Sequence, residues 1–282
     1  MIILSLLALA ALGVIWVHWV EPNWFHLRHE TVRIRKSLTG PLTILHLSDL
    51  HLTKPRFFMS RFFDRLSRLH VDFVFVTGDL IDGPGGILPC IASLKKLKPR
   101  HGIYAVLGNH DYQCYPLSKQ LHRIITRKHY GRERSETNHL KKALREAGIH
   151  LMENQNTLVA VKGQEICLIG VDDPVTGHSN LRQAFRGVKN EKLQITLVHS
   201  PRTFPALKKR GIDIAFSGHT HGGQLRLPKL GPLPGVKRLE RIIDSTHRYG
   251  FAGLVSRGMG ANPSIRVRLF CRPEAVLVRV EE

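Results

Sequence analysis

The chain has 282 residues, 43% of them hydrophobic, which is enough for one large domain or two small ones with an ample core. Its 42 Lys and Arg against 22 Asp and Glu give a formal charge of +20, which favours an anionic partner without choosing among nucleic acid, lipid headgroups and phosphorylated substrates. The four cysteines are widely spaced and form no C-x-x-C pair, which excludes a disulfide framework and fits a reducing compartment.

The first predicted element is an apolar helix. The segment 2–20 contains no charged side chain, and a helix of that length is roughly 28 Å long, about the thickness of a bilayer's hydrocarbon core. All three tryptophans of the chain, Trp16, Trp19 and Trp24, follow at its carboxyl end, where an interfacial aromatic belt would lie. We therefore expect residues 1–20 to be a retained transmembrane anchor. A cleaved signal peptide is the alternative, disfavoured because no basic region precedes the apolar run.

Basic residues follow this segment, whereas none precedes it. They are Arg28, Arg33, Arg35 and Lys36. The positive-inside rule then predicts a single-pass protein of the inner membrane with its globular part on the cytoplasmic side. We expect residues 21–40 to form a basic linker against anionic headgroups and residues 41–282 to form one domain.

Strands and helices alternate at the start of that domain. Apolar runs predict strands over Thr43–Leu47, Asp72–Val76 and Gly102–Leu107. Apolar residues on one helical face predict helices over Phe58–Leu69 and Ile87–Leu97. Three strand–helix units in succession indicate a layered α/β core with helices on both faces.

A polar, basic stretch over 112–147 interrupts this alternation, and strands prevail after it. The stretch predicts helices around Pro116–Lys128 and Glu136–Ala147. The later strands are predicted at Thr157–Val161, Glu165–Gly170, Gln194–Val198, Asp213–Ser217, Leu254–Ser256, Ser264–Phe270 and Ala275–Val280, with helices around Asn180–Arg186 and Thr203–Lys209.

Potential metal ligands follow five of these strands. In chain order they are Asp49 and His51, Asp79, Asn109 and His110, His199, and finally His219 and His221 in the loop Gly-His-Thr-His-Gly-Gly. Ligands in open α/β sheets gather at the carboxyl ends of strands, so these side chains are expected to converge. Taken singly, the earlier pieces have plainer explanations as turn residues or structural histidines, whereas two histidines in a glycine-rich loop have no packing purpose. The ordered set of carboxylates and imidazoles instead predicts a site for a borderline divalent cation.

These blocks resemble the five signature blocks of the calcineurin-like metallophosphoesterases, over roughly residues 41–280. The resemblance implies an α/β fold, a four-layer β-sandwich flanked by helices, here preceded by one transmembrane helix. It also implies two divalent metal ions, for which we expect Mn, with Fe or Zn as alternatives. By the same resemblance, Asp49, His51 and His221 would hold one ion, Asn109, His199 and His219 the other, and Asp79 would bridge both.

The resemblance also implies two catalytic side chains. His110 would donate a proton to the leaving oxygen, and Asp82 would orient that histidine. The Ser/Thr protein phosphatases of the family carry an arginine directly after this aspartate. Gly83 stands there in this chain, which argues against a phosphoprotein phosphatase.

The anchor, the His-Ser-Pro sequence at 199–201 and Gln224 resemble a membrane-anchored bacterial branch of the family. Some members of that branch are similar to UDP-2,3-diacylglucosamine hydrolases of lipid A synthesis, which release UMP and a lipid-linked sugar 1-phosphate. We therefore expect a phosphorylated lipid-linked substrate and a membrane as partners, with no nucleic acid and no obligate protein partner. The alternatives are a broad-specificity phosphodiesterase or lipid phosphatase of the same fold, or a non-enzymatic basic protein that binds membranes or nucleic acid. The last would bind with an affinity that falls steeply with salt.

Two stretches are candidates for lipid contact. Aromatic residues Phe57, Phe58, Phe62 and Phe63 begin just past the first metal motif, although ordinary core packing of a helix would also explain them. The basic stretch 118–147 would cap the site and receive acyl chains, or else form a solvated helical hairpin.

Overall fold

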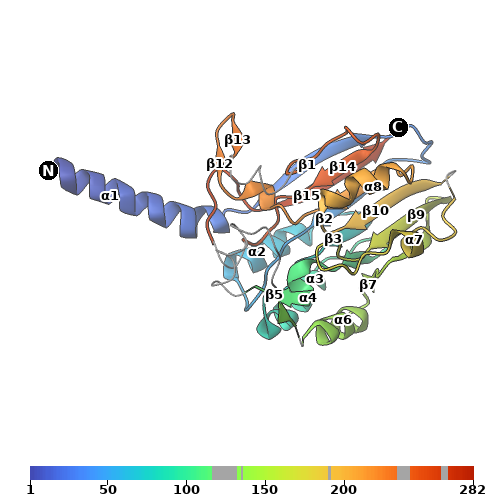
Figure 1. Ribbon diagram of the computed structural model, residues 1–282, viewed down its shortest axis with the longest axis horizontal. Coiled ribbons are helices and arrows are strands. Elements are labelled where there is room, and N and C mark those ends of the chain that lie inside the picture. The colour runs from blue at the N-terminus through green and yellow to red at the C-terminus, as the bar shows by residue number, and fades with distance from the viewer. Residues whose placement is uncertain (116–131, 135, 190–191, 234–241, 262–265) are drawn as a thin grey trace.

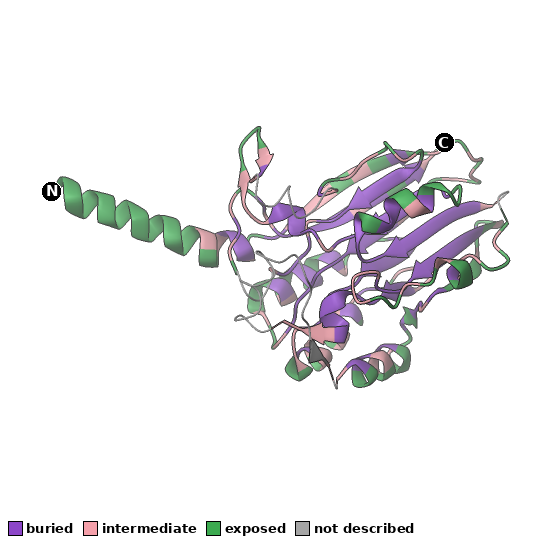
Figure 2. Ribbon diagram, viewed as in Figure 1, coloured by how far each residue is buried: buried purple, intermediate pink, exposed green. Residues whose placement is uncertain are grey.

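A long helix extends from a body of two packed sheets (Figure 1). The computed structural model describes residues 1–115, 132–134, 136–189, 192–233, 242–261 and 266–282. The helix α1 covers Ile2–Ile15 and continues through shorter helical turns as far as Asn23. It is exposed along its length, whereas the central strands of the two sheets are buried (Figure 2).

The first sheet contains six strands. They are β1 (His26–Arg33), β2 (Leu42–Leu47), β3 (Phe73–Thr77), β4 (Ile103–Val106), β7 (His150–Leu151) and β15 (Glu274–Glu281). Their order is β1-β15-β2-β3-β4-β7. The pairs β2–β3, β3–β4 and β4–β7 are parallel, and β15 runs antiparallel to β2. The carboxyl ends of β2, β3 and β4 therefore lie at the same edge.

The second sheet contains five strands. They are β8 (Gln155–Val161), β9 (Gln164–Val171), β10 (Leu193–Val198), β11 (Ile214–Ser217) and β14 (Ala252–Val255). Their order is β14-β11-β10-β9-β8, and every pair except β8–β9 is parallel. Two antiparallel pairs of short strands stand apart, one of β5 (Gln113–Cys114) and β6 (Arg132–Glu133), the other of β12 (Arg226–Leu227) and β13 (Gly231–Pro232).

Helices cover the outer face of each sheet. They are α2 (Phe57–Leu66), α3 (Ile87–Leu94), α4 (Asn109–Tyr112), α6 (Thr137–Glu146), α7 (Leu181–Ala184) and α8 (Phe204–Lys208). In β3, Phe73 and Phe75 pack between the sheets, whereas Val74 and Val76 pack against α2, α3 and α6, as the two-residue period of a strand requires. The helices α7 and α8 cover the second sheet in the same way. The result is four layers, and the predicted flanked β-sandwich is confirmed.

Two predicted elements differ from the structure or lie outside it. The helix expected at 116–128 falls on residues that the structure does not describe. The strand expected at 264–270 is wrong for its described part, since residues 266–270 form no strand and Leu269 makes a single bridge to Leu225. The other predicted strands and helices are present, with ends shifted by a few residues.

The predicted basic linker 21–40 contains a strand of the first sheet. This strand, β1, pairs in parallel with β15 over eight residues, from His26 opposite Glu274 to Arg33 opposite Glu281. Its arginines are also paired within the fold: Arg28 contacts Glu30 and Glu274, and Arg33 contacts Glu281. Arg28 and Arg33 are thus paired with carboxylates of the same chain, whereas the sequence predicted that this segment would lie against anionic headgroups.

The four phenylalanines of α2 divide between core and surface. Phe62 and Phe63 are buried with Met59 and Leu66, which follows from their spacing along one helical face. Burial of such a side chain contributes roughly 1.5–3 kcal/mol. Phe57 and Phe58 are instead 66% and 44% exposed. Core packing therefore explains half of this aromatic cluster and leaves the other half facing outward.

The basic stretch 118–147 is described only in part. Within it, α6 buries Leu140 and Leu144 against the core of the first sheet. This helix is therefore packed on the domain, in agreement with the helix predicted at 136–147.

Candidate metal centre

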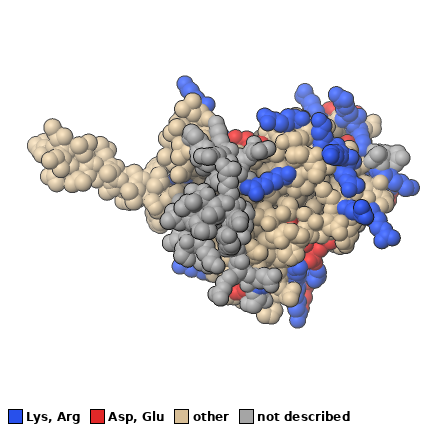
Figure 3. Space-filling view, in the orientation of Figure 1, with Lys and Arg blue, Asp and Glu red and all other residues tan. Residues whose placement is uncertain are grey.

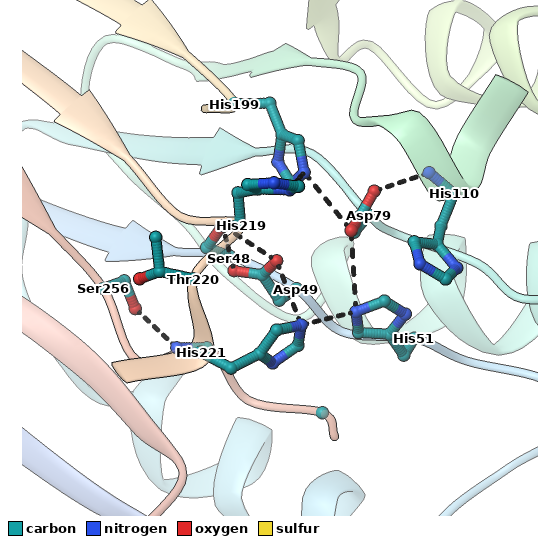
Figure 4. Close-up of polar contacts among 12 residues, drawn as sticks. Ser48, Asp49, His51, Asp79, His110, His199, His219, Thr220, His221 and Ser256 are labelled. Carbon is teal, nitrogen blue, oxygen red and sulfur yellow. Dashed lines mark hydrogen bonds and ion pairs between the residues drawn. The ribbon is translucent and has the colours of Figure 1, made fainter. Parts of the chain in front are cut away.

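Five strand ends bring their polar side chains to one place. The loops after β2, β3 and β4 meet those after β10 and β11, because the parallel strands of both sheets end at adjoining edges (Figure 4). The residues gathered there are Asp49, His51, Asp79, Asn109, His110, His199, His219 and His221. All of them are buried except His219, which is partly buried. The cluster thus brings together all the site residues singled out in the sequence except Asp82, which lies behind His51 and His110.

One half of the cluster consists of Asp49, His51, Asp79 and His221, whose ligand atoms all lie within 4.8 Å of one another. The Nε2 atoms of His51 and His221 are 3.1 Å apart. His51 Nε2 is 3.6 Å from Asp79 Oδ2, and His221 Nε2 is 3.6 Å from Asp49 Oδ1. Four donors thus surround one point.

The other half consists of Asp79, His199 and His219, joined by Asn109. His199 Nε2 lies 3.2 Å from each of three atoms: Asp79 Oδ2, Asn109 Oδ1 and His219 Nδ1. Asp79 belongs to both halves, and its Oδ2 atom approaches a histidine in each of them. The two halves therefore share one carboxylate.

The donor set fits divalent metal ions. In each half, two imidazole nitrogens face each other at 3.1–3.2 Å with carboxylate oxygens beside them. Two nitrogens at this distance cannot both present lone pairs to each other, so one of them carries a proton when no metal is bound, and a cation between them and the carboxylate takes the place of that proton. Mixed imidazole and carboxylate donors suit a borderline transition metal. Asp79 is placed to contact an ion in either half.

The backbone at the strand ends is held in an uncommon conformation. Positive φ angles occur at Asp49 (52°), His51 (47°), Asp79 (54°), His219 (69°) and His221 (50°). A left-handed residue other than glycine costs of the order of 1–3 kcal/mol, and such strain concentrates at functional sites. These turns aim side chains from separate loops at a shared centre.

Close packing explains why glycines flank the ligands. A Cβ atom on Gly78 would lie 2.6 Å from His199 Nδ1, and one on Gly218 would lie 1.8 Å from Ser48 Oγ. A larger residue at either position would push the neighbouring loop away from the cluster. The glycines of the Gly-Asp and Gly-His-Thr-His motifs therefore allow the two sheets' loops to approach.

Asp82 joins the metal cluster to His110. Its Oδ1 atom is 2.9 Å from His110 Nδ1 and its Oδ2 atom is 2.9 Å from His51 Nδ1. The sequence predicts the first contact but not the second, through which Asp82 also orients a candidate ligand. Burial alone would raise the pKa of Asp82, but His51 and His110 hold it well below its usual range. The backbone N–H of His110 donates to Asp79 Oδ1 at 2.8 Å, which fixes the histidine beside the cluster.

Two histidines of the metal-free cluster retain protons. Burial alone would lower their pKa values, but nearby carboxylates dominate: Asp82, Asp79 and Asp49 raise the pKa of His51 to about 9, and Asp79 and Asp49 raise that of His199 to about 10. Both rings are therefore protonated at pH 7, and a metal ion must displace those protons to bind.

We expect the affinity for a divalent ion to rise between pH 7 and about 9. A group with a raised pKa binds its proton below that pKa and loses it above. Each proton that the metal must displace therefore makes the metal affinity rise by up to about tenfold per pH unit below that pKa. Titration calorimetry of the metal-free protein in two buffers of different ionisation enthalpy counts the protons released. An affinity independent of pH over this range would contradict the protonated state described above.

Arg134 is a functional candidate that the sequence does not single out. Its Nε atom donates to the His110 carbonyl oxygen at 2.6 Å, and its Nη2 atom lies 3.8 Å from Asp82 Oδ1. A guanidinium beside His110 is suited to bind phosphoryl oxygens. Arg134 lies in a stretch with many other basic residues, and local sequence gives no reason to choose it.

Arg268 is a second missed residue, buried beside Asp49. It donates to the carbonyl oxygens of Arg257 and Cys271 at 2.8 and 2.9 Å, which holds the loop after β14 in place. In that loop, the N–H of Met259 donates to Ser48 O at 2.9 Å. Arg268 thereby supports the backbone from which Asp49 projects.

Comparisons with known proteins agree with this arrangement. The sequence model of the family described as calcineurin-like phosphoesterase matches residues 42–223. An uncharacterized metallophosphoesterase of Bacillus subtilis, YkoQ, is 29% identical over 85% of this chain and 83% of its own. The phosphodiesterase YaeI of Escherichia coli is 26% identical over 94% and 92%, and the UDP-2,3-diacylglucosamine pyrophosphatase LpxG of Chlamydia muridarum is 27% identical over 98% and 95%.

Proposed function

Because the chain belongs to the calcineurin-like phosphoesterase family, we propose that it hydrolyses a lipid-linked phosphoester or pyrophosphate at a two-metal centre. One ion would be held by Asp49, His51 and His221, the other by Asn109, His199 and His219, and both by Asp79. The observation that carries this proposal is the position of Asp79, whose Oδ2 atom lies 3.6 Å from His51 Nε2 and 3.2 Å from His199 Nε2. We propose Mn as the metal, with Fe or Zn as alternatives.

The side chains around the centre have separate roles. When bound, a pair of divalent ions lowers the pKa of a water molecule and neutralises charge on phosphoryl oxygens. Asp82 Oδ1 accepts a hydrogen bond from the Nδ1–H of His110, and the ring with a second proton on Nε2 would give that proton to the leaving oxygen and become neutral. Arg134 holds the His110 carbonyl, and its guanidinium would bind a phosphoryl oxygen that enters beside His110.

We propose UDP-2,3-diacylglucosamine as the substrate, cleaved to UMP and the lipid-linked sugar 1-phosphate of lipid A synthesis. Two observations support this choice. The relative LpxG carries that substrate in its name and aligns with nearly the whole chain. The helix over Ile2–Asn23 is apolar, long enough to span a bilayer and exposed, so an anchored enzyme would meet a lipid substrate in two dimensions.

A broad-specificity phosphodiesterase is the second candidate. It is favoured by the relative YaeI, named a phosphodiesterase, which aligns with 94% of this chain. Such a phosphodiesterase would use the same metal centre and would differ only in the part of the substrate that is bound around that centre.

We further propose an inner-membrane location with the catalytic domain on the cytoplasmic side. The apolar helix supports an anchor, and the excess of Lys and Arg after it supports this orientation by the positive-inside rule. Protease accessibility of the domain in right-side-out vesicles, compared with inside-out vesicles, tests the orientation.

The substrate is tested with the purified full-length protein in detergent with Mn²⁺ and UDP-2,3-diacylglucosamine. We expect release of UMP, measured by chromatography, and little release from UDP-N-acetylglucosamine, which lacks acyl chains. Turnover of simple aryl phosphodiesters without UMP release would exclude the lipid A assignment and favour the broad phosphodiesterase.

A further inference from the structure

An apolar groove lies where the anchor helix meets the catalytic domain. It has a volume of about 390 Å³ and is lined by Trp16, Trp19, Val20, Asn23, Trp24 and Phe58. The ring of Trp19 meets that of Phe58 edge-on at 6.2 Å, and Trp16 meets Trp24 edge-on at 5.8 Å. The groove thus has walls from both the anchor and α2.

The groove is joined to the domain by buried polar contacts. Glu21, at the base of the anchor, is 2% exposed; it accepts hydrogen bonds from Trp16 Nε1 at 3.0 Å and from the Cys271 N–H at 2.5 Å. Directly before α2, the Arg56 guanidinium donates to Pro22 O at 3.3 Å and to Asn23 Oδ1 at 3.1 Å. The base of the helix is therefore held in a defined position.

The same contacts lead to the metal centre. Cys271 donates its backbone N–H to Glu21, and its thiol lies 3.2 Å from the carbonyl oxygen of His221. A single residue thus separates the base of the anchor from a candidate metal ligand.

The surroundings of the groove match an amphiphile with an anionic head. Its lining continues the charge-free surface of α1, on which no Lys, Arg, Asp or Glu appears (Figure 3). At its edge, the Arg272 guanidinium stacks 4.0 Å from the centre of the Trp24 ring, and the Arg56 guanidinium lies 5.9 Å from that of Phe25. An acyl chain would contact the rings, and the cations at the edge favour the anionic head of the lipid on its way to the metal centre.

We propose that this groove binds an acyl chain of the lipid-linked substrate and so sets the distance of its phosphate from the metal centre. This inference rests on the proposed hydrolysis of a lipid-linked ester. Continuity with the bilayer-facing helix and the cationic edge both point to a lipid rather than to an apolar peptide. The sequence draws attention to Phe57 and Phe58 together, but only Phe58 lines the groove.

The test compares two esters that share one phosphodiester headgroup and differ in chain length, myristoyl or butyryl. Three forms of the full-length protein are assayed with Mn²⁺ in mixed micelles: the unchanged protein, the double variant Trp19→Ser/Phe58→Ser and the matched control Phe57→Ser. Phe57 is an equally large and more exposed ring on the same helix, outside the groove lining. We expect the ratio of kcat/KM for the long over the short ester to fall about tenfold in the double variant and less than twofold in the control.

Two results would overturn the inference: an unchanged ratio in the double variant, or an equal loss of the ratio in Phe57→Ser, which would indicate general contact with the micelle. An enzyme that cleaves neither ester would refute the proposed function, and binding would then decide the inference separately. All three tryptophans of the chain line the groove, so their fluorescence reports on its occupancy. A brominated myristoyl phosphate should quench this fluorescence saturably, and less so in Phe58→Ser; quenching that rises linearly without saturation would contradict a site.

Discussion

Replacement of Asp79 by asparagine is expected to lower kcat/KM for a soluble aryl phosphodiester by about 10³-fold. Burial alone would raise the pKa of Asp79, but His199, His110 and His51 hold it well below its usual range, so the carboxylate is ionised at neutral pH. Its Oδ2 atom is the one oxygen shared by both halves of the cluster, and removing its charge weakens both metal sites. Stabilisation of charge by bound metal is worth several kcal/mol, and each tenfold loss of kcat/KM corresponds to about 1.4 kcal/mol of lost stabilisation.

The measurement pairs steady-state kinetics with metal content by mass spectrometry. The matched control is Asp64→Asn, the same chemical change at an exposed carboxylate on α2 that pairs with Lys96. We expect the control to keep both metal and activity. Full activity and metal content in Asp79→Asn would refute a shared carboxylate and with it the two-metal centre.

His110→Asn is expected to lower kcat by about 10²–10⁴-fold on esters with a poor leaving group and much less on p-nitrophenyl esters. The reason is that a proton on the leaving oxygen matters when that oxygen is basic, and hardly matters for a stable phenolate. His110 Nδ1 lies 2.9 Å from Asp82 Oδ1, so the ring is oriented with Nε2 free to donate.

Kinetics over a series of aryl and alkyl esters measures this effect as a slope against leaving-group pKa. The slope should steepen in His110→Asn and stay unchanged in His139→Asn, which alters an exposed histidine on α6. An equal loss across the whole series would instead assign His110 to metal binding or to structure.

The local pattern of the sequence predicts much of the fold. The continuous apolar run within Asp72–Val76 and the helical spacing of apolar residues in α2 are visible in the chain, because each is a pattern of neighbouring residues. The strand at 264–270 was predicted from the same kind of pattern and is absent from the described residues 266–270. Short apolar runs do not distinguish a strand from an extended loop that packs on the core.

Strand β1 shows a second reason why the local sequence does not predict every strand. Residues 26–33 read as a basic linker because charged residues interrupt them, yet they pair with β15 from the far end of the chain. Pairing at such a sequence separation depends on tertiary packing, and nothing local to residues 26–33 reports the carboxylates Glu274 and Glu281 that offset the arginines.

The sequence by itself determined the order of the ligand motifs, the strands that end in them and the apolar helix before them. Each of these is a property of a few adjacent residues. Only the tertiary structure decided that Asp82 contacts both His51 and His110, that Arg134 lies beside His110, and that Cys271 links the anchor to His221. These contacts join segments far apart in the chain, and they depend on how loops turn and sheets pack, which no local pattern of residues encodes.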